Sequence, residues 1–277
     1  MITWFTDAFA SELSQRALVA GLLVVVTTSI VGTWVVLRGL TFFTEALAHG
    51  VLPGVALAVV WQVDLVLGAL ASAAVMVAGV GVVSRRTRLR EDVAIGLLFV
   101  GMLALGVIII SKKGSYAGDL SHVLFGDILG VTTADLRLQA AVAVIAIASL
   151  VLYRPFLALA FNRSKAAVLG LRPTLTHLAL LSLVALSIVT SFRAVGTLLV
   201  FGLLVAPPAT GSLLARRVPV MMATGVAVGV VSVTLGLTIS YHAGTAASAT
   251  MAGTAVGVFF VVLLAREAAN LLHHRSV

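Results

Sequence analysis

Long apolar runs separated by short polar stretches dominate the pattern of this chain. A membrane-spanning helix takes roughly 20 mostly apolar residues, and nine runs approach that length. They are residues 17–37, 46–62, 65–83, 93–111, 137–153, 174–191, 195–214, 219–240 and 245–265. Because the second run is interrupted, the pattern predicts eight or nine membrane helices. The predicted architecture is an all-α, polytopic integral membrane protein.

Domain organisation follows from the same pattern. The chain is predicted to be a single transmembrane domain over residues 1–277, with a membrane core at 15–265 and a tail at 266–277. The segment 118–136 is too short and too polar to span, so it is interpreted as a half-helix or a segment lying on the membrane surface. Such backbone is tolerated at depth only where protein or water satisfies its polar groups.

Composition and charge support this class and exclude others. The chain is 61% hydrophobic and only 10% charged, whereas a soluble domain carries about a quarter charged residues. The net charge of +8 does not indicate nucleic-acid binding, because the basic residues cluster in short gaps between apolar runs, as in cytoplasmic membrane loops. The basic gaps are 84–92, 153–173, 216–217 and the tail. They predict a cytoplasmic side for these loops and an outer N-terminus.

Several chemistries are excluded by missing motifs. The chain has no cysteine, so it forms no disulfide and no thiolate metal site. It has no G-x-x-x-x-G-K-[ST], G-x-S-x-G or H-E-x-x-H, so neither a P-loop ATPase nor a familiar hydrolase site is present. The sequence therefore predicts a protein that is not an enzyme.

The stretch "TFFTEALAHGVLPGVALA" places an acid and an imidazole at the start of the second apolar run. Ionisable groups inside a bilayer cost about 2.5–3.5 kcal/mol each on insertion scales, and they usually face a cavity or a transported species. Glu45 and His49 are spaced i, i+4 and project from one helix face. Their oxygen and nitrogen ligands suit zinc, manganese or iron(II). Two other interpretations are a buried hydrogen-bonded pair and a Glu45 that complements the dipole of a wet helix start.

A predicted helix break lies directly after this pair. Pro53 has no N–H, so the carbonyl of His49, four residues back, loses its helical partner. Gly50 and Gly54 flank the break and allow the backbone to bend or another helix to approach closely.

A second polar cluster in "DLSHVLFGDIL" supplies further candidate metal ligands, Asp119, His122 and Asp127. Asp119 is better explained as the cap of a short helix. His177, at the start of an apolar run, is interpreted as an interfacial or packing histidine, and His242 is left open.

The order of these landmarks resembles the permease subunits of bacterial ABC importers for manganese, zinc and iron(II), the ABC-3 family. The first stretch is similar to that family's acid-x-x-x-His-x-x-x-Pro-Gly signature, although the family's usual acid is Asp and this chain has Glu45. Segments 91–111, 119–131 and 195–214 follow in the family's order. The extra methylene of Glu45 puts the geometry and metal selectivity of the site in question.

This resemblance implies a type II ABC importer-like fold in the bacterial cytoplasmic membrane. It implies a homodimer, separate cytoplasmic ATPase subunits, an extracytoplasmic metal-binding protein and alternating access. No tightly bound cofactor is implied, and the transported ion is zinc or manganese, with iron(II) also compatible. The cytoplasmic coupling region is expected at 154–174, as a short helix closed by a glycine. Its expected coupling residues are Asn162, Arg163, Ser164, Lys165 and Gly170.

Two other functions remain open on sequence alone. An ion-coupled secondary transporter or channel for the same cations would also place broken helices at mid-membrane. A purely structural membrane subunit would not depend on Glu45 or His49.

Overall fold

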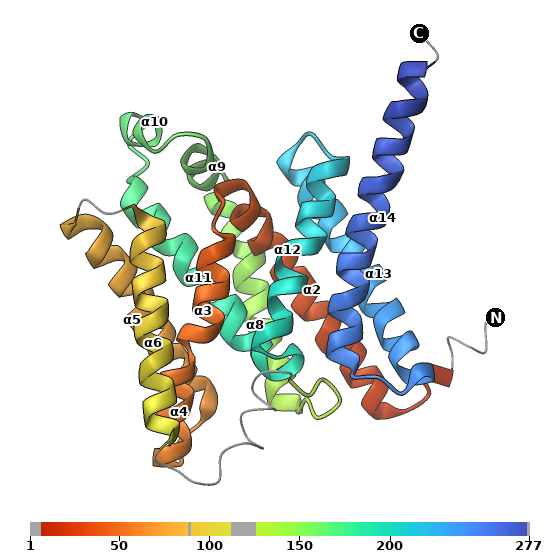
Figure 1. Cartoon of the computed structure of the whole chain (residues 1–277), viewed down its shortest axis with the longest axis horizontal. Coiled ribbons are helices and arrows are strands. Elements are labelled where there is room, and N and C mark those ends of the chain that lie inside the picture. Colours follow the sequence, from red (N-terminus) through yellow and green to blue (C-terminus); the bar gives the residue numbers. More distant parts are fainter. Residues whose placement is uncertain (1–6, 88–89, 112–125, 276–277) are drawn as a thin grey trace.

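The protein is built from helices, as the computed structural model in Figure 1 shows. The structure describes residues 7–87, 90–111 and 126–275, and no strand occurs in these ranges. The longer helices are α2 (Glu12–Arg38), α5 (Leu65–Arg86), α6 (Glu91–Ser111), α8 (Thr133–Ala148), α11 (Pro173–Val195), α12 (Thr197–Leu214), α13 (Val218–Ala243) and α14 (Ala247–Arg275). The shorter helices are α3 (Thr41–Gly50), α4 (Leu52–Trp61), α9 (Tyr153–Phe161) and α10 (Arg163–Val168).

These helices account for the predicted membrane spans. Within the described residues, eight helical stretches are long and apolar enough to cross a membrane, and a shorter apolar helix runs over Leu199–Leu214. Helices α3 and α4 together form one of these stretches, Thr41–Trp61. The prediction of eight or nine membrane helices is confirmed.

The fifth span is longer than predicted at both ends. It runs from Thr133 to Phe161, through α8, a 3-10 turn at Ser149–Leu152 and α9. At its start, Thr132 and Asp135 form a capping box, which satisfies orphan backbone N–H groups and fixes the helix start. At its end, Phe156 and Leu159 are both 1% exposed, so burial of these side chains favours continued helix into the predicted coupling region.

The segment predicted to lie on the membrane surface is only partly described. Residues 118–125 lie outside the described residues. Residues 128–130 form a bend and turn, closed by the N–H of Gly130 donating to the carbonyl of Asp127 at 3.2 Å. From Thr133 onward the chain belongs to the α8 span.

Helix α2 is central to the packing. It contacts α8, α11, α12 and α13, and Figure 1 shows α4, α5 and α6 on one flank of the molecule and α13 and α14 on the other. One buried cluster includes Trp34 and Phe43 with much of α11. The other includes Val25, Leu203 and Met251. Helix α3, which carries Glu45 and His49, therefore lies inside the bundle, against α6, α11 and α12.

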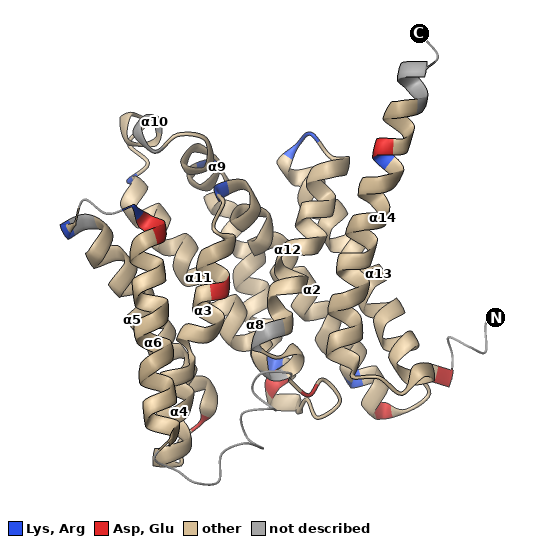
Figure 2. Cartoon of the chain, viewed as in Figure 1, with Lys and Arg blue, Asp and Glu red and all other residues tan. Residues whose placement is uncertain are grey.

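The described basic loops gather at one end of the molecule. Figure 2 shows Lys and Arg at the α5–α6 connection, around α9 and α10, and at the α12–α13 connection, all at the end toward which α14 extends. The start of α2 lies toward the opposite end. The loops grouped by charge in the sequence thus share one end of the fold.

Candidate metal site

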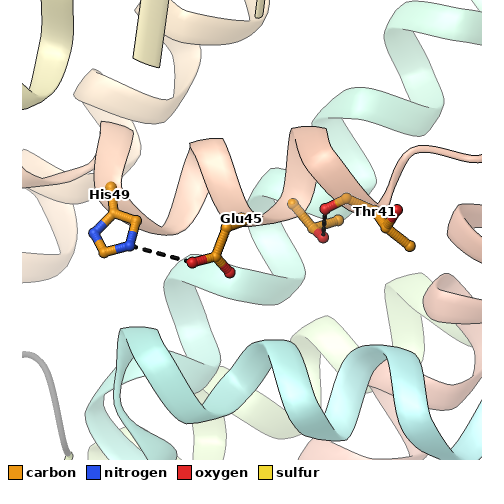
Figure 3. A network of polar contacts seen from close by, with 4 residues as sticks. Thr41, Glu45 and His49 are labelled. Atoms are coloured by element: carbon orange, nitrogen blue, oxygen red, sulfur yellow. Dashed lines mark hydrogen bonds and ion pairs between the residues drawn. The ribbon is translucent and has the colours of Figure 1, made fainter. Parts of the chain in front are cut away.

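Glu45 and His49 form a contact pair on α3, hereafter the metal pair. The Nε2 atom of His49 lies 3.3 Å from Oε1 of Glu45. Figure 3 shows both side chains projecting from the same side of the helix, with the imidazole turned toward the carboxylate. Their i, i+4 spacing thus has the consequence predicted from the sequence.

The metal pair is neither sealed in packing nor fully in solvent. The side chain of Glu45 is 40% exposed and that of His49 is 21% exposed. One side of the imidazole is held by α6, where the ring of Phe99 lies 5.7 Å from it, centroid to centroid. A carboxylate oxygen and a ring nitrogen can therefore reach an ion while the imidazole stays oriented.

The metal pair brings together only two candidate metal ligands. Among the described residues, no group of three or more His, Asp or Glu is placed to hold a metal ion. Zinc takes at least four ligands and manganese prefers more, drawn largely from oxygen and nitrogen. The metal pair alone therefore matches a transient or shared site better than a closed structural one.

The predicted helix break is present, and the neighbouring helix α5 packs against it. Helix α3 ends at Gly50 and α4 begins at Leu52, with Pro53 in its first turn. The carbonyl of Gly50 accepts a hydrogen bond of 2.7 Å from the hydroxyl of Ser72. Pro53 thus sits where its missing N–H is harmless, and a side chain from α5 satisfies a carbonyl at the break.

The glycines of the break permit close helix packing. A Cβ added to Gly54 would lie 1.9 Å from the carbonyl oxygen of Gly68, and one added to Gly50 would lie 2.3 Å from Sδ of Met76. Both neighbours belong to α5. Of the two roles expected for these glycines, close approach of a second helix is the one that the structure shows.

The second cluster of candidate ligands is not assembled with the metal pair. Asp119 and His122 lie outside the described residues. Asp127 is exposed and its Oδ1 accepts the N–H of Gly130 at 3.0 Å, which is a turn-forming role. Their part in metal binding stays a prediction.

Comparison with known proteins assigns the chain to a family. The profile of the ABC 3 transport family matches residues 10–266. The chain belongs to this family. The manganese transport system membrane protein MntC of Listeria monocytogenes is 33% identical over 263 residues, which cover 95% of this chain and 94% of the relative. A probable iron transport system membrane protein of Haemophilus influenzae is 34% identical, over 96% of this chain and 97% of the relative.

A solved structure gives the same result for the fold. The chain is similar to a structure of PsaBC from Streptococcus pneumoniae in complex with Fab, with a TM-score of 0.83, 30% identity and 95% coverage of both chains. Together with the apolar spans, membership of the ABC 3 family establishes a multi-pass permease subunit of the bacterial cytoplasmic membrane. As an ABC permease, it works with ATPase and substrate-binding partners.

The expected coupling region of this ABC 3 chain has the predicted form. Helix α10 is short (Arg163–Val168) and follows Asn162, the residue that caps α9. Gly170 then adopts a φ of +71°, and α11 starts at Pro173. The side chains of Arg163, Ser164 and Lys165 are outside the described set, so their coupling roles stay predictions.

Sequence reasoning missed a polar group at the basic end. His177 is in contact with Glu91 at the start of α6 and with Arg38 at the end of α2. Charged residues at helix ends are ordinary, so neither Arg38 nor Glu91 stood out in the sequence. The interpretation of His177 as an interfacial or packing residue was incomplete, because its two ring nitrogens both have polar partners.

Proposed function

We propose that this chain is the permease subunit of an ABC importer that moves a divalent transition metal ion into the cell by alternating access. The metal pair carries the proposal: a carboxylate and an imidazole lie in contact and partly exposed on a helix inside the bundle. The names of the two relatives, a manganese and an iron transport protein, support a metal cargo. The positive-inside rule places the basic end in the cytoplasm.

The ligand atoms of the metal pair limit which metal ions it can bind. One oxygen and one nitrogen donor, with no thiolate in the chain, suit manganese, iron(II) and zinc and disfavour copper(I). Manganese is the first candidate because it is named in the MntC relative. Iron(II) and zinc are the competitors to include in every uptake assay.

Two copies of the chain complete the site in this proposal. Each copy brings one carboxylate and one imidazole, so two metal pairs facing each other supply two oxygen and two nitrogen ligands. The partial exposure of the metal pair in a single chain supports a shared position between copies. The mass of the permease purified without its ATPase tests this pairing. If two copies of the 28.6-kDa chain associate, that mass should be twice the value for one chain once bound detergent is subtracted.

The cytoplasmic partner is proposed to bind at α9 and α10. Phe161, Val168 and Leu169 are 80%, 89% and 67% exposed there, and a shallow groove beside them is lined by Arg154, Leu157 and Leu171. Apolar side chains at the basic, non-lipid end of a membrane protein suit burial against another subunit. The extracytoplasmic metal-binding protein would then dock at the opposite end.

In this mechanism the chain binds, orients and releases the ion. The imidazole must be neutral and the carboxylate ionised to act as ligands, and Phe99 keeps the ring of His49 facing Glu45. Because each chain contributes only two ligands, the affinity for the ion stays low enough for the ion to be released. The ATPase partners supply the energy, because this chain has no P-loop.

Isotopic metal uptake in a strain that lacks its own metal importers tests this function. Uptake should require the chain together with its ATPase, and Glu45→Gln and His49→Ala should abolish it. Glu12→Gln, an exposed acid at the start of α2, is the matched control and should transport normally. Metal transport by the purified chain alone down a proton or sodium gradient would identify a secondary transporter instead. Unchanged uptake in both metal-pair variants would leave only a structural role.

A further inference from the structure

Three side chains from helices far apart in the sequence meet at the basic end of the molecule. Nε2 of His177 lies 2.7 Å from Oε1 of Glu91, and Nδ1 of His177 lies 3.4 Å from Nη2 of Arg38. Nη1 of Arg38 also donates to the carbonyl of Leu159 at 2.7 Å. We name Arg38, Glu91 and His177 the polar junction. The side chain of His177 is only 8% exposed and that of Glu91 is 29% exposed.

The two ring nitrogens of His177 face side chains of opposite charge. Arginine has donors only, so the ring nitrogen that faces Arg38 acts as the acceptor. The other ring nitrogen, Nε2, faces the carboxylate of Glu91. The imidazole thus lies between a guanidinium and a carboxylate, each facing a different ring nitrogen.

Each contact of the polar junction lies at an end of a helix that matters for transport. Arg38 is the last residue of α2, and Gly39 at φ +66° turns the chain directly into α3. Glu91 is the first residue of α6. Leu159 belongs to α9, which packs on α10, and His177 lies in the second turn of α11, just after α10.

Two rigid paths lead from the polar junction to the metal pair. Along α6, Glu91 is about two turns from Phe99, whose ring contacts that of His49. Along the other path, the turn at Gly39 connects Arg38 to α3, which carries both Glu45 and His49. A displacement of α9 or α11 would therefore reach the metal pair from two sides.

The surroundings allow the polar junction to rearrange. A cavity of about 50 Å³ lies against it, lined by Glu91, His177 and Ser84 among others, which is room for water. The hydroxyl of Ser84 is buried and has no hydrogen-bond partner among the described residues. If Glu91 and His177 separate, polar partners are available to both, so a second arrangement does not leave a buried charge unsolvated.

A purely stabilising role explains this arrangement less well. Buried ionic groups gain little net stability, because their desolvation offsets most of the attraction. We propose that the polar junction transmits movement of the α9–α10 segment to the helices that hold the metal pair, so that Arg38, Glu91 and His177 are positioning residues for transport. This inference rests on the proposed function and on the ATPase binding at α9 and α10.

The test compares energy use with metal movement in the permease–ATPase complex reconstituted in proteoliposomes with its metal-binding protein. Glu91→Ala and His177→Ala should each lower the Mn²⁺ imported per ATP hydrolysed by about fivefold, the lower end of typical couplings between sites. The double variant should be no worse than either single one, because both remove the same contact. Asp92→Asn, an adjacent acid that is 66% exposed, should leave the ratio unchanged.

The melting temperature of each complex separates transmission from stability. Fewer Mn²⁺ ions imported per ATP at an unchanged melting temperature support the inference. If the alanine variants fail to assemble, Glu91→Gln replaces them, because it keeps one acceptor for His177 but removes the charge. The inference is wrong if the variant complexes assemble, transport Mn²⁺ and keep the wild-type number of Mn²⁺ ions imported per ATP. It is also wrong if that number falls only in proportion to a fall in melting temperature. A wild-type complex that imports no metal contradicts the proposed function first, and this inference with it.

Discussion

The metal pair and the polar junction each bring an acid and a histidine together within an apolar bundle, yet the sequence specifies them in different ways. Glu45 and His49 lie one turn apart on a single helix, and their contact follows from local geometry. Arg38, Glu91 and His177 come from α2, α6 and α11 and meet only because those helices pack together. A contact within one helix is kept when the helices shift relative to each other, whereas a contact between helices changes with such a shift.

The largest expected effect separates the two sites directly. Loss of a residue that only orients a metal ligand costs about 10–100-fold in affinity or activity, so His49→Ala, which removes a ligand, should lower Mn²⁺ uptake by about 100-fold or more. His242→Ala, an exposed histidine at the end of α13, is the control. Uptake would be measured with isotopic Mn²⁺ at matched protein levels. Comparable losses in the two variants would contradict a special role for His49.

A second change tests how far the metal pair depends on the packing beneath it. Gly54→Ala would place a Cβ 1.9 Å from the carbonyl of Gly68, which should force α4 and α5 apart and destabilise the protein by about 1–3 kcal/mol. Gly101→Ala on α6 has open space around its Cβ and should be neutral or slightly stabilising. Thermal unfolding in detergent measures both. Equal melting temperatures would show that the α4–α5 contact is looser than the structure indicates.

A third change sharpens the description of the polar junction. Arg38 uses two guanidinium nitrogens for two different partners, the carbonyl of Leu159 and the ring of His177. Arg38→Lys keeps the charge but offers a single ammonium group, so Mn²⁺ imported per ATP should fall by about twofold, a smaller loss than the roughly fivefold loss expected for His177→Ala within the same coupling range. Arg16→Lys, an exposed residue of α2, should have no effect. A ratio at the wild-type level would mean that charge alone suffices at Arg38.

The smallest expected effect concerns selectivity. Glu45→Asp restores the shorter acid of the family signature and withdraws the carboxylate by roughly one bond length, about 1.5 Å. We expect uptake to change by less than about twofold for Mn²⁺, with a different ratio of Mn²⁺ to Zn²⁺, because the two ions prefer different ligand numbers and geometries. Competition between the two isotopes in one assay measures the ratio. An identical ratio in both proteins would assign selectivity to other residues or to the binding protein.

The sequence predicted the features that depend on local pattern. The apolar runs predicted the membrane-spanning helices, because a helix in lipid satisfies the hydrogen-bonding groups of its own backbone. The i, i+4 spacing gave the metal pair, and the glycine and proline around α10 gave the form of the coupling segment. These signals are all contained within about 20 consecutive residues.

Features that depend on distant contacts were not predictable in the same way. His177 looked like a packing residue because its partners, Arg38 and Glu91, are far away in the sequence. The helix through Phe161 was predicted to end earlier, because burial of Phe156 and Leu159 comes from tertiary packing. The choice between bending and close approach at Gly54 also required the position of Gly68.

The contact between Gly54 and Gly68 limits how α4 and α5 can move relative to each other. Main chain meets main chain there, and no flexible side chain lies between α4 and α5 to absorb sliding. Closely packed elements of this kind move together rather than deform. We therefore expect α4 and α5 to move together as a block during transport, without unwinding of α4.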